Sequence, residues 1–182
     1  MTTNTINSNA ATAIATVIAI KYSTPQPNTM KRRNGESVFY VGYSDFLEGK
    51  LVNVQVGQPD DHLRHWEFHF EQHDGSKILL TMPYYSPTAL AILCRLPNID
   101  LNAVFGVSFT SRATVFTNVE ITQNGNDIAP YYLPDALNGL PPAIPIVEAD
   151  GSPSLHIGRQ LAYMESFVPA LFLTANQIES IS

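Results

Sequence analysis

The chain has 182 residues, of which 45% are hydrophobic and 14% charged, so it can bury a sizeable core and is not a disordered polymer. Its formal net charge of −6 argues against a protein that wraps duplex DNA through bulk electrostatic attraction. The acidic excess lies toward the C-terminus. Residues 1–112 carry nine Lys and Arg against nine Asp and Glu, whereas residues 113–182 carry one against seven.

The N-terminal segment, residues 1–36, is predicted to be an arm ahead of the main domain. Its apolar run at residues 10–20 is too short to cross a bilayer and no basic residue precedes it, so we expect a cytoplasmic protein with no membrane partner. Residues 10–22 fit a strand or a helix, and we favour a strand. Residues 23–35 are rich in Pro, Asn and Gly and are predicted to form a loop.

That loop carries three consecutive cations, Lys31, Arg32 and Arg33, and no acidic residue. Our first interpretation is a solvated basic loop. The alternative is an arm that contacts phosphate groups.

Residues 37–43 and 46–56 are both predicted to be strands, because β-branched and aromatic side chains dominate them. Gly49 in the second of them permits a bulge or sharp coiling. The clearest pattern follows at residues 65–71, where aromatic residues alternate with His and Glu at the period of a strand. The aromatic residues, Trp66, Phe68 and Phe70, are expected to face the core.

A turn at Asp74-Gly75 is expected to reverse the chain into a partner strand over residues 77–84, which completes a β-hairpin. Ser86 and Pro87 have the residue types of a helix N-cap and first helical position, and apolar residues then recur at helical spacing. We therefore predict a helix over residues 87–96. Cys94, the single cysteine, falls inside this pattern and is predicted to be a buried, inert thiol.

A second hairpin is predicted from residues 103–110 and 114–122, and Asn124-Gly125 then turns the chain again. Counted from the strand at residues 46–56, with residues 37–43 as a further strand ahead of it, the order within residues 37–129 is three strands, one helix and two strands. A helix only between the third and fourth strands is typical of a five-stranded OB-fold barrel, so the predicted fold class is mainly β.

The remaining residues, 130–182, are predicted to form a C-terminal extension packed on the barrel. Five prolines between residues 130 and 145 favour an extended segment over the barrel surface. An amphipathic helix is expected from Gly158, and Pro169 is expected to kink or end it.

Several short motifs resemble a family of phage-encoded single-stranded DNA-binding proteins, best known from phages of Bacteroides-like hosts. The motifs are Tyr43, Asp45 and Gly49 around the first barrel strand, WEFHF at residues 66–70, Tyr85-Ser86 at the helix entry, LPNID at residues 96–100, and QNG before PYY. The resemblance implies an OB fold that binds single-stranded DNA in replication or recombination. It also implies no catalysis, no cofactor and replication proteins as further partners.

Binding a single strand requires cations along the backbone path and flat groups on which bases stack. The chain offers candidates of both kinds on the predicted barrel strands and turns, and we expect one or two of the tyrosines to be exposed. The candidates are the cations Lys50, Arg64, Lys77 and Arg112 and the tyrosines Tyr43, Tyr84 and Tyr85.

Two other interpretations stay open. His65, Glu67 and His69 share one face of a strand at alternate positions, a pattern that can hold a divalent metal and would indicate a cupin-like metal-dependent enzyme. The barrel could instead be an interaction or structural module without nucleic-acid binding, and a homo-oligomer is compatible with each interpretation. No nucleophile elbow, phosphate-binding glycine loop or Cys pair is present, so an enzyme is not the expected class.

Overall fold

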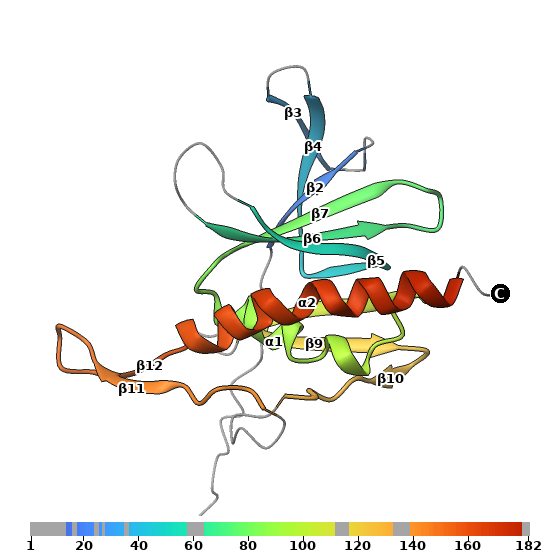
Figure 1. Cartoon of the computed structure of the whole chain (residues 1–182). Helices are drawn as coiled ribbons and strands as arrows, with labels where there is room; N and C mark the ends of the chain where they lie inside the picture. The colour runs from blue at the N-terminus through green and yellow to red at the C-terminus, as the bar shows by residue number, and fades with distance from the viewer. Residues whose placement is uncertain are drawn as a thin grey trace, which may run out of the picture.

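The computed structural model describes residues 14–15, 18–23, 26, 28–34, 37–57, 64–111, 117–132 and 139–179. These residues form one large antiparallel sheet, a separate two-stranded hairpin, two α-helices and one short 3-10 helix (Figure 1). The prediction of a mainly β chain is confirmed. Within the described ranges, neither helix is long and apolar enough to cross a membrane.

Each strand of the large sheet pairs antiparallel with its neighbours. A two-residue strand, β1 (Ile14–Ala15), joins the sheet beside β8. The other strands lie in the order β10 (Asn126–Asp127), β9 (Thr117–Gln123), β8 (Phe105–Ser111), β5 (Phe46–Gly57), β6 (His65–Glu71), β7 (Lys77–Pro83), β2 (Ile18–Tyr22), β4 (Ser37–Ser44) and β3 (Met30–Asn34).

Strand β5 changes partners along its length. Residues 46–49 pair with β8 and residues 50–57 pair with β6, with a register irregularity between Leu51 and Asn53. At Gly49 a Cβ atom would lie 3.1 Å from the Glu71 carbonyl oxygen and 3.2 Å from the Phe70 Cβ. Glycine therefore permits the close approach where the strand passes from one partner to the other, as predicted.

The predicted closed barrel is wrong for the described part of the sheet. Closing the five strands around β5 would require β7 to pair with β9, but β7 pairs instead with β2, with Ile20 opposite Leu80. The sheet then continues through β4 to β3. The N-terminal segment supplies hydrogen-bond partners to the exposed edge of β7, so closure is not needed to protect that edge.

The N-terminal segment is more regular than predicted. The preference for a strand within residues 10–22 is confirmed by β2, and the loop predicted for residues 23–35 is wrong in its second half, which forms β3. Strand β3 pairs along its whole length with β4. The pairing places Lys31, Arg32 and Arg33 in a strand instead of a loop.

The helix predicted after the central hairpin is present as α1 (Pro87–Leu93), followed by the 3-10 helix η1 (Leu96–Asn98). The Ala89 amide donates a 3.2 Å hydrogen bond to the Ser86 Oγ, which confirms the predicted cap. The helix lies between β7 and β8 in the chain, as expected, and buries Ala89, Ile92 and Leu93.

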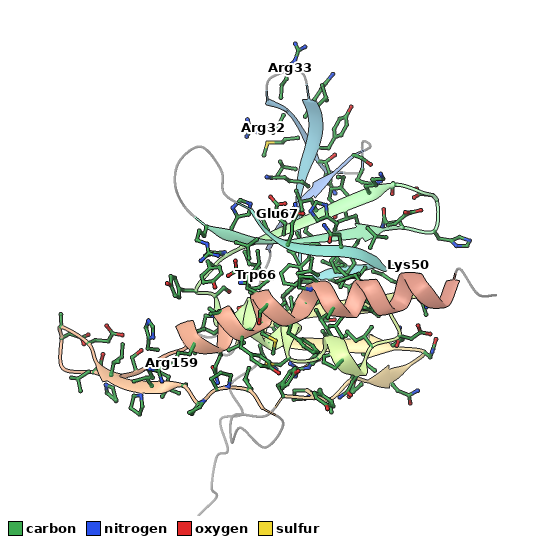
Figure 2. The ribbon with its side chains drawn as sticks, viewed as in Figure 1. Arg32, Arg33, Lys50, Trp66, Glu67 and Arg159 are labelled. Atoms are coloured by element: carbon green, nitrogen blue, oxygen red, sulfur yellow. The ribbon has the colours of Figure 1, made fainter. Side chains whose placement is uncertain are left out.

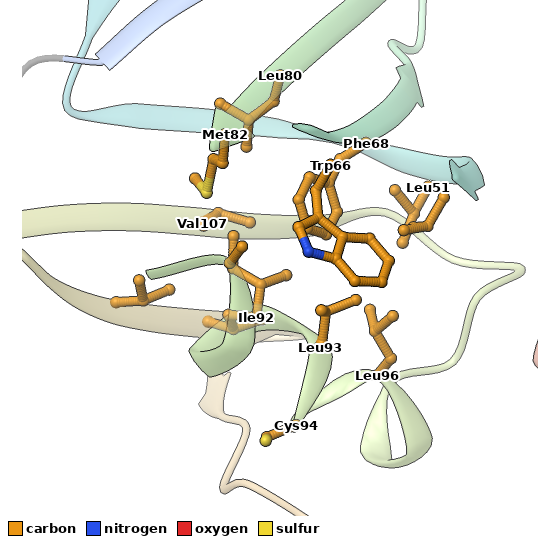
Figure 3. Packing of buried hydrophobic residues seen from close by; sticks show 14 of the residues in the cluster. Leu51, Trp66, Phe68, Leu80, Met82, Ile92, Leu93, Cys94, Leu96 and Val107 are labelled. Atoms are coloured by element: carbon orange, nitrogen blue, oxygen red, sulfur yellow. The ribbon is translucent and has the colours of Figure 1, made fainter. Parts of the chain in front are cut away.

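Trp66, Phe68 and Phe70 are almost completely buried, which confirms their predicted core position. In Figure 3 the Trp66 ring points toward Leu93 of α1 and Leu96 of η1, so the hairpin of β6 and β7 packs on both helices. Cys94 is also buried, and burial raises the pKa of its thiol to about 11. The prediction of a buried thiol is confirmed.

The C-terminal extension contains a hairpin that the sequence did not predict, formed by β11 (Ile144–Val147) and β12 (Pro153–His156). Helix α2 (Gly158–Glu179) follows and lies across the sheet (Figure 1). Of the two outcomes expected at Pro169, an end of the helix is wrong, because α2 continues past this residue, and a kink stays a prediction. Pro169 is exposed, whereas the buried face begun by Leu161, Met164 and Val168 continues past it through partly buried Leu171 and Phe172. Packing therefore maintains the helix beyond the proline.

Candidate nucleic-acid interface

A groove of about 630 Å³ lies on the outer face of the part of the sheet formed by β2, β4, β5, β6 and β7. Side chains or backbone from all five strands line it. The lining residues include the apolar Val38, Val52 and Leu79, the half-buried Tyr22, and the polar or charged Lys21, Ser23, Asn53, His69, Glu71 and Lys77. The groove therefore combines an apolar floor with two lysines and one carboxylate.

Strand alternation explains which side chains reach this face. Because Trp66, Phe68 and Phe70 point into the core, the intervening residues of β6 point outward. The pairing then builds a continuous row across four strands: Asn53 lies opposite His69, His69 opposite Leu79, and Leu79 opposite Lys21. Leu79 is an apolar residue at an outward-facing position, a signal in the sequence that could have indicated the groove.

Two predicted cations, Lys50 and Lys77, flank Glu71 at one end of this face. Each lies opposite Glu71, which separates them on the central strand. Lys77 is exposed and lines the groove. Lys50 is half-buried and is not one of the lining residues. Lys21 joins them only through the β2–β7 pairing, and for that reason its contribution could not be predicted from its position in the chain.

Arg64 and Tyr84 lie at the other end of the hairpin and contact α2. The Arg64 Nη2 donates to Glu165 Oε1 at 2.5 Å, and the Tyr84 hydroxyl donates to Glu165 Oε2 at 2.8 Å. The guanidinium carbon lies 4.1 Å from the centre of the Tyr84 ring, which itself stacks on Trp66 at 5.7 Å. Both side chains are therefore engaged within the protein, and we leave them out of the proposed site.

The two adjacent tyrosines differ in exposure. Tyr84 is buried, and burial, together with the hydrogen bond to Glu165, raises its pKa to about 12. Tyr85 is 64% exposed and meets the Tyr84 ring edge to face at 5.1 Å. Only Tyr85 of this pair presents a ring to solvent, in agreement with the expectation that one or two of the tyrosines are exposed.

Two further candidates are not placed by side-chain geometry. Arg112 lies outside the described residues. Tyr43 lies in β4 opposite Ala19, but the described side chains do not include it. Both stay predictions.

On the outward face of β6, His65 and His69 both contact the carboxylate of Glu67. Glu67 Oε1 lies 2.8 Å from His65 Nε2, and Glu67 Oε2 lies 3.3 Å from His69 Nε2. Gln55 donates a further hydrogen bond of 2.7 Å to Oε2. Partial burial opposes ionisation of Glu67, but the hydrogen bonds from Gln55, His65 and His69 outweigh it and lower the pKa of this carboxyl.

Each carboxylate oxygen of Glu67 therefore faces an imidazole nitrogen of the same strand. Across the part of the chain that the structure describes, no group of three or more His, Cys, Asp or Glu is arranged to hold a metal ion. The geometry indicates a hydrogen-bonded triplet at the edge of the groove.

No protein-family model, curated protein or solved structure matches this chain. The resemblance to phage single-stranded DNA-binding proteins therefore stays an expectation from sequence motifs, and a functional argument rests on the geometry of the groove.

Proposed function

We propose that the chain binds single-stranded DNA along the groove on the outer face of the sheet, without catalysis and without a cofactor. The observation that carries the proposal is an apolar groove floor combined with lysines at the groove. Val38 and Val52 are each 41% exposed there, and Lys21 and Lys77 are two of the lining residues. Single-strand sites combine cations for the phosphates with flat side chains on which bases stack, and Tyr22 and His69 are the flat groups that line the groove beside the valines.

The distribution of charge supports a local attraction despite the net charge of −6. Much of the positive charge of the chain lies in strands β2, β3, β5 and β7. The cations of these strands are Lys21, Lys31, Arg32, Arg33, Lys50 and Lys77. These cations can attract an anionic polymer locally, although Glu67 and Glu71 of β6 lie between β5 and β7, because salt screens acidic residues that are more than about 8 Å away at physiological ionic strength.

The arrangement around β5 is compatible with an open form of the predicted OB fold. Strands β6 and β7 follow on one side of β5, strands β8 and β9 on the other, and α1 connects the two sides. OB folds are partly open and bind oligonucleotides across their outer face. The proposal therefore includes a role in DNA replication or recombination, as the family resemblance implies.

Fluorescence anisotropy with labelled oligothymidine tests the proposal. With Lys21, Lys50 and Lys77 at the groove, an oligonucleotide of about 6 nucleotides should bind with a salt slope of about −2, since each phosphate contact on a single strand contributes about −0.7. Apolar contact supplies the part of the affinity that salt does not change. No anisotropy change at low salt and tens of micromolar protein would overturn the function.

A further inference from the structure

Strands β3 and β4 form a two-stranded ribbon at the end of the large sheet, away from α2 (Figure 1). Three consecutive residues of β3, Lys31, Arg32 and Arg33, are all exposed, and Figure 2 shows Arg32 and Arg33 toward the end of this ribbon. Residues 28–44 contain these three cations and one acidic residue, Glu36, which lies between β3 and β4 in the sequence. The segment therefore carries a net charge of +2, and the charge of β3 itself is +3.

Nothing described in the protein neutralises this charge. Lys31 lies opposite Tyr40, Arg32 opposite Phe39 and Arg33 opposite Val38, so no cation faces a carboxylate across the ribbon. Among the described residues, none of the three forms an ion pair. Three adjacent like charges repel one another, and an external anion would relieve that repulsion.

The ribbon is continuous with the groove. Val38, opposite Arg33, lines the groove, and so does Tyr22. On the face of the outward row, Lys21 lies opposite Val41 and Val41 lies opposite Met30, which adjoins Lys31 in β3.

We infer that the β3–β4 ribbon binds the phosphate backbone of the single strand that leaves the groove, so that the site consists of an apolar groove and a cationic arm. The inference rests on the proposed function and extends it by assigning the phosphate contacts. Arginine suits this role because its planar guanidinium can hold two phosphate oxygens at once, and Lys31 adds a point charge. The ligand is a flexible single strand, which can bend from the groove onto the ribbon.

The cations also have a simpler explanation. Strand β3 is an edge strand of the sheet, and Lys or Arg on an edge strand keeps it from pairing with another chain. On that explanation, removing the charges promotes self-association and leaves DNA binding unchanged. The two explanations therefore differ in the measured salt slope.

The test compares charge-removing and charge-keeping variants of the full chain. A variant with Lys31→Gln, Arg32→Gln and Arg33→Gln removes the charge, and a variant with Arg32→Lys and Arg33→Lys retains it. A third variant, Arg33→Gln, removes one cation from the ribbon. Its matched control is Arg159→Gln, which removes one exposed cation from α2, far from the ribbon in Figure 2. Circular dichroism melting and gel filtration establish that each variant is folded and report its oligomeric state.

Binding is measured by anisotropy with oligothymidine of about 6 and about 20 nucleotides, between about 50 and 200 mM salt. For the longer strand, the triple Gln variant should lose about 2 units of salt slope, since three contacts contribute about 0.7 each. The Lys variant should keep the wild-type slope. The shorter strand should bind the triple Gln variant and the Lys variant with the same affinity and the same salt slope. Arg33→Gln should lose about 0.7 units and Arg159→Gln none.

An unchanged slope for the triple Gln variant, with wild-type protein that binds, overturns the role of the ribbon and leaves the groove in place. Failure of wild-type protein to bind either strand overturns the proposed function itself. If duplex DNA of about 20 base pairs competes as well as the single strand, and this competition disappears in the triple Gln variant, the assignment of the ribbon to single strands is wrong.

Discussion

The Tyr84 hydroxyl donates a hydrogen bond of 2.8 Å to Glu165 Oε2, and this bond connects the central hairpin to α2 across 81 positions of the chain. The same carboxylate accepts a hydrogen bond from Arg64, whose guanidinium lies over the Tyr84 ring. The stack continues into the core through Trp66. The C-terminal helix is therefore attached to the sheet by a polar contact as well as by its buried apolar face.

Replacing Tyr84 by Phe should lower the free energy of unfolding by about 1 kcal/mol, because it removes one hydrogen bond to a carboxylate and keeps the ring that stacks on Trp66. The measurement is urea unfolding followed by circular dichroism. Tyr85→Phe is the matched control, since this neighbouring ring is mostly exposed. Equal destabilisation by both changes would contradict the role of the Tyr84 hydroxyl.

Cys94 should react slowly with a thiol reagent in the folded protein. Burial raises the pKa of its thiol from 9.0 to about 11, and the thiolate is the reactive form, so at pH 8 the folded protein should react about 100-fold more slowly than the chain in urea. The rate of reaction with a chromogenic disulfide measures this ratio. Equal rates in buffer and in urea would show that the thiol is accessible.

The lowered pKa of Glu67 leads to a prediction of how the stability of the protein changes with pH. Because its pKa is lowered in the folded protein, the stabilising contribution is fully present above the ordinary pKa of 4.5 and is lost as the pH falls through the lowered value. Between about pH 5 and pH 3, the melting temperature of the wild-type protein should therefore fall more steeply than that of Glu67→Gln.

The control for this pH dependence is Glu71→Gln, which removes a carboxylate from the same face of β6 and leaves the hydrogen bonds of Glu67 intact. This variant should follow the wild-type dependence. A Glu67→Gln profile parallel to the wild-type profile would show that the hydrogen bonds from Gln55, His65 and His69 do not stabilise the fold.

Local patterns in the sequence predicted the central hairpin and the helix after it. The alternation at Trp66, Phe68 and Phe70 and the Ser86-Pro87 cap each specify a conformation through neighbouring residues alone. The turn at Asn124-Gly125 belongs to the same class, since both residues have positive φ, as a two-residue hairpin turn requires.

Pairings between distant segments could not be predicted in this way. The open sheet depends on β2 reaching the edge of β7, and the groove depends on Lys21 then lying opposite Leu79. Likewise, the sequence predicted Arg64 and Tyr84 to contact DNA, but in the fold both side chains bind Glu165 of α2. In both cases the decisive partner is far away in the chain, where periodicity carries no information.

Lys77 and Arg64 provide the sharpest test of where the interface lies, because they are exposed cations at opposite ends of one hairpin. Lys77 lines the groove, so Lys77→Gln should make the salt slope for short oligothymidine shallower by about 0.7 and leave stability unchanged. Arg64 is paired with Glu165 and lies over Tyr84, so Arg64→Gln should cost about 0.5–1 kcal/mol of unfolding free energy and leave the slope unchanged. Anisotropy titrations and urea unfolding of both variants measure the two quantities. The reverse pattern would move the DNA path from the groove to the end of the hairpin beside α2, where Tyr85 is exposed.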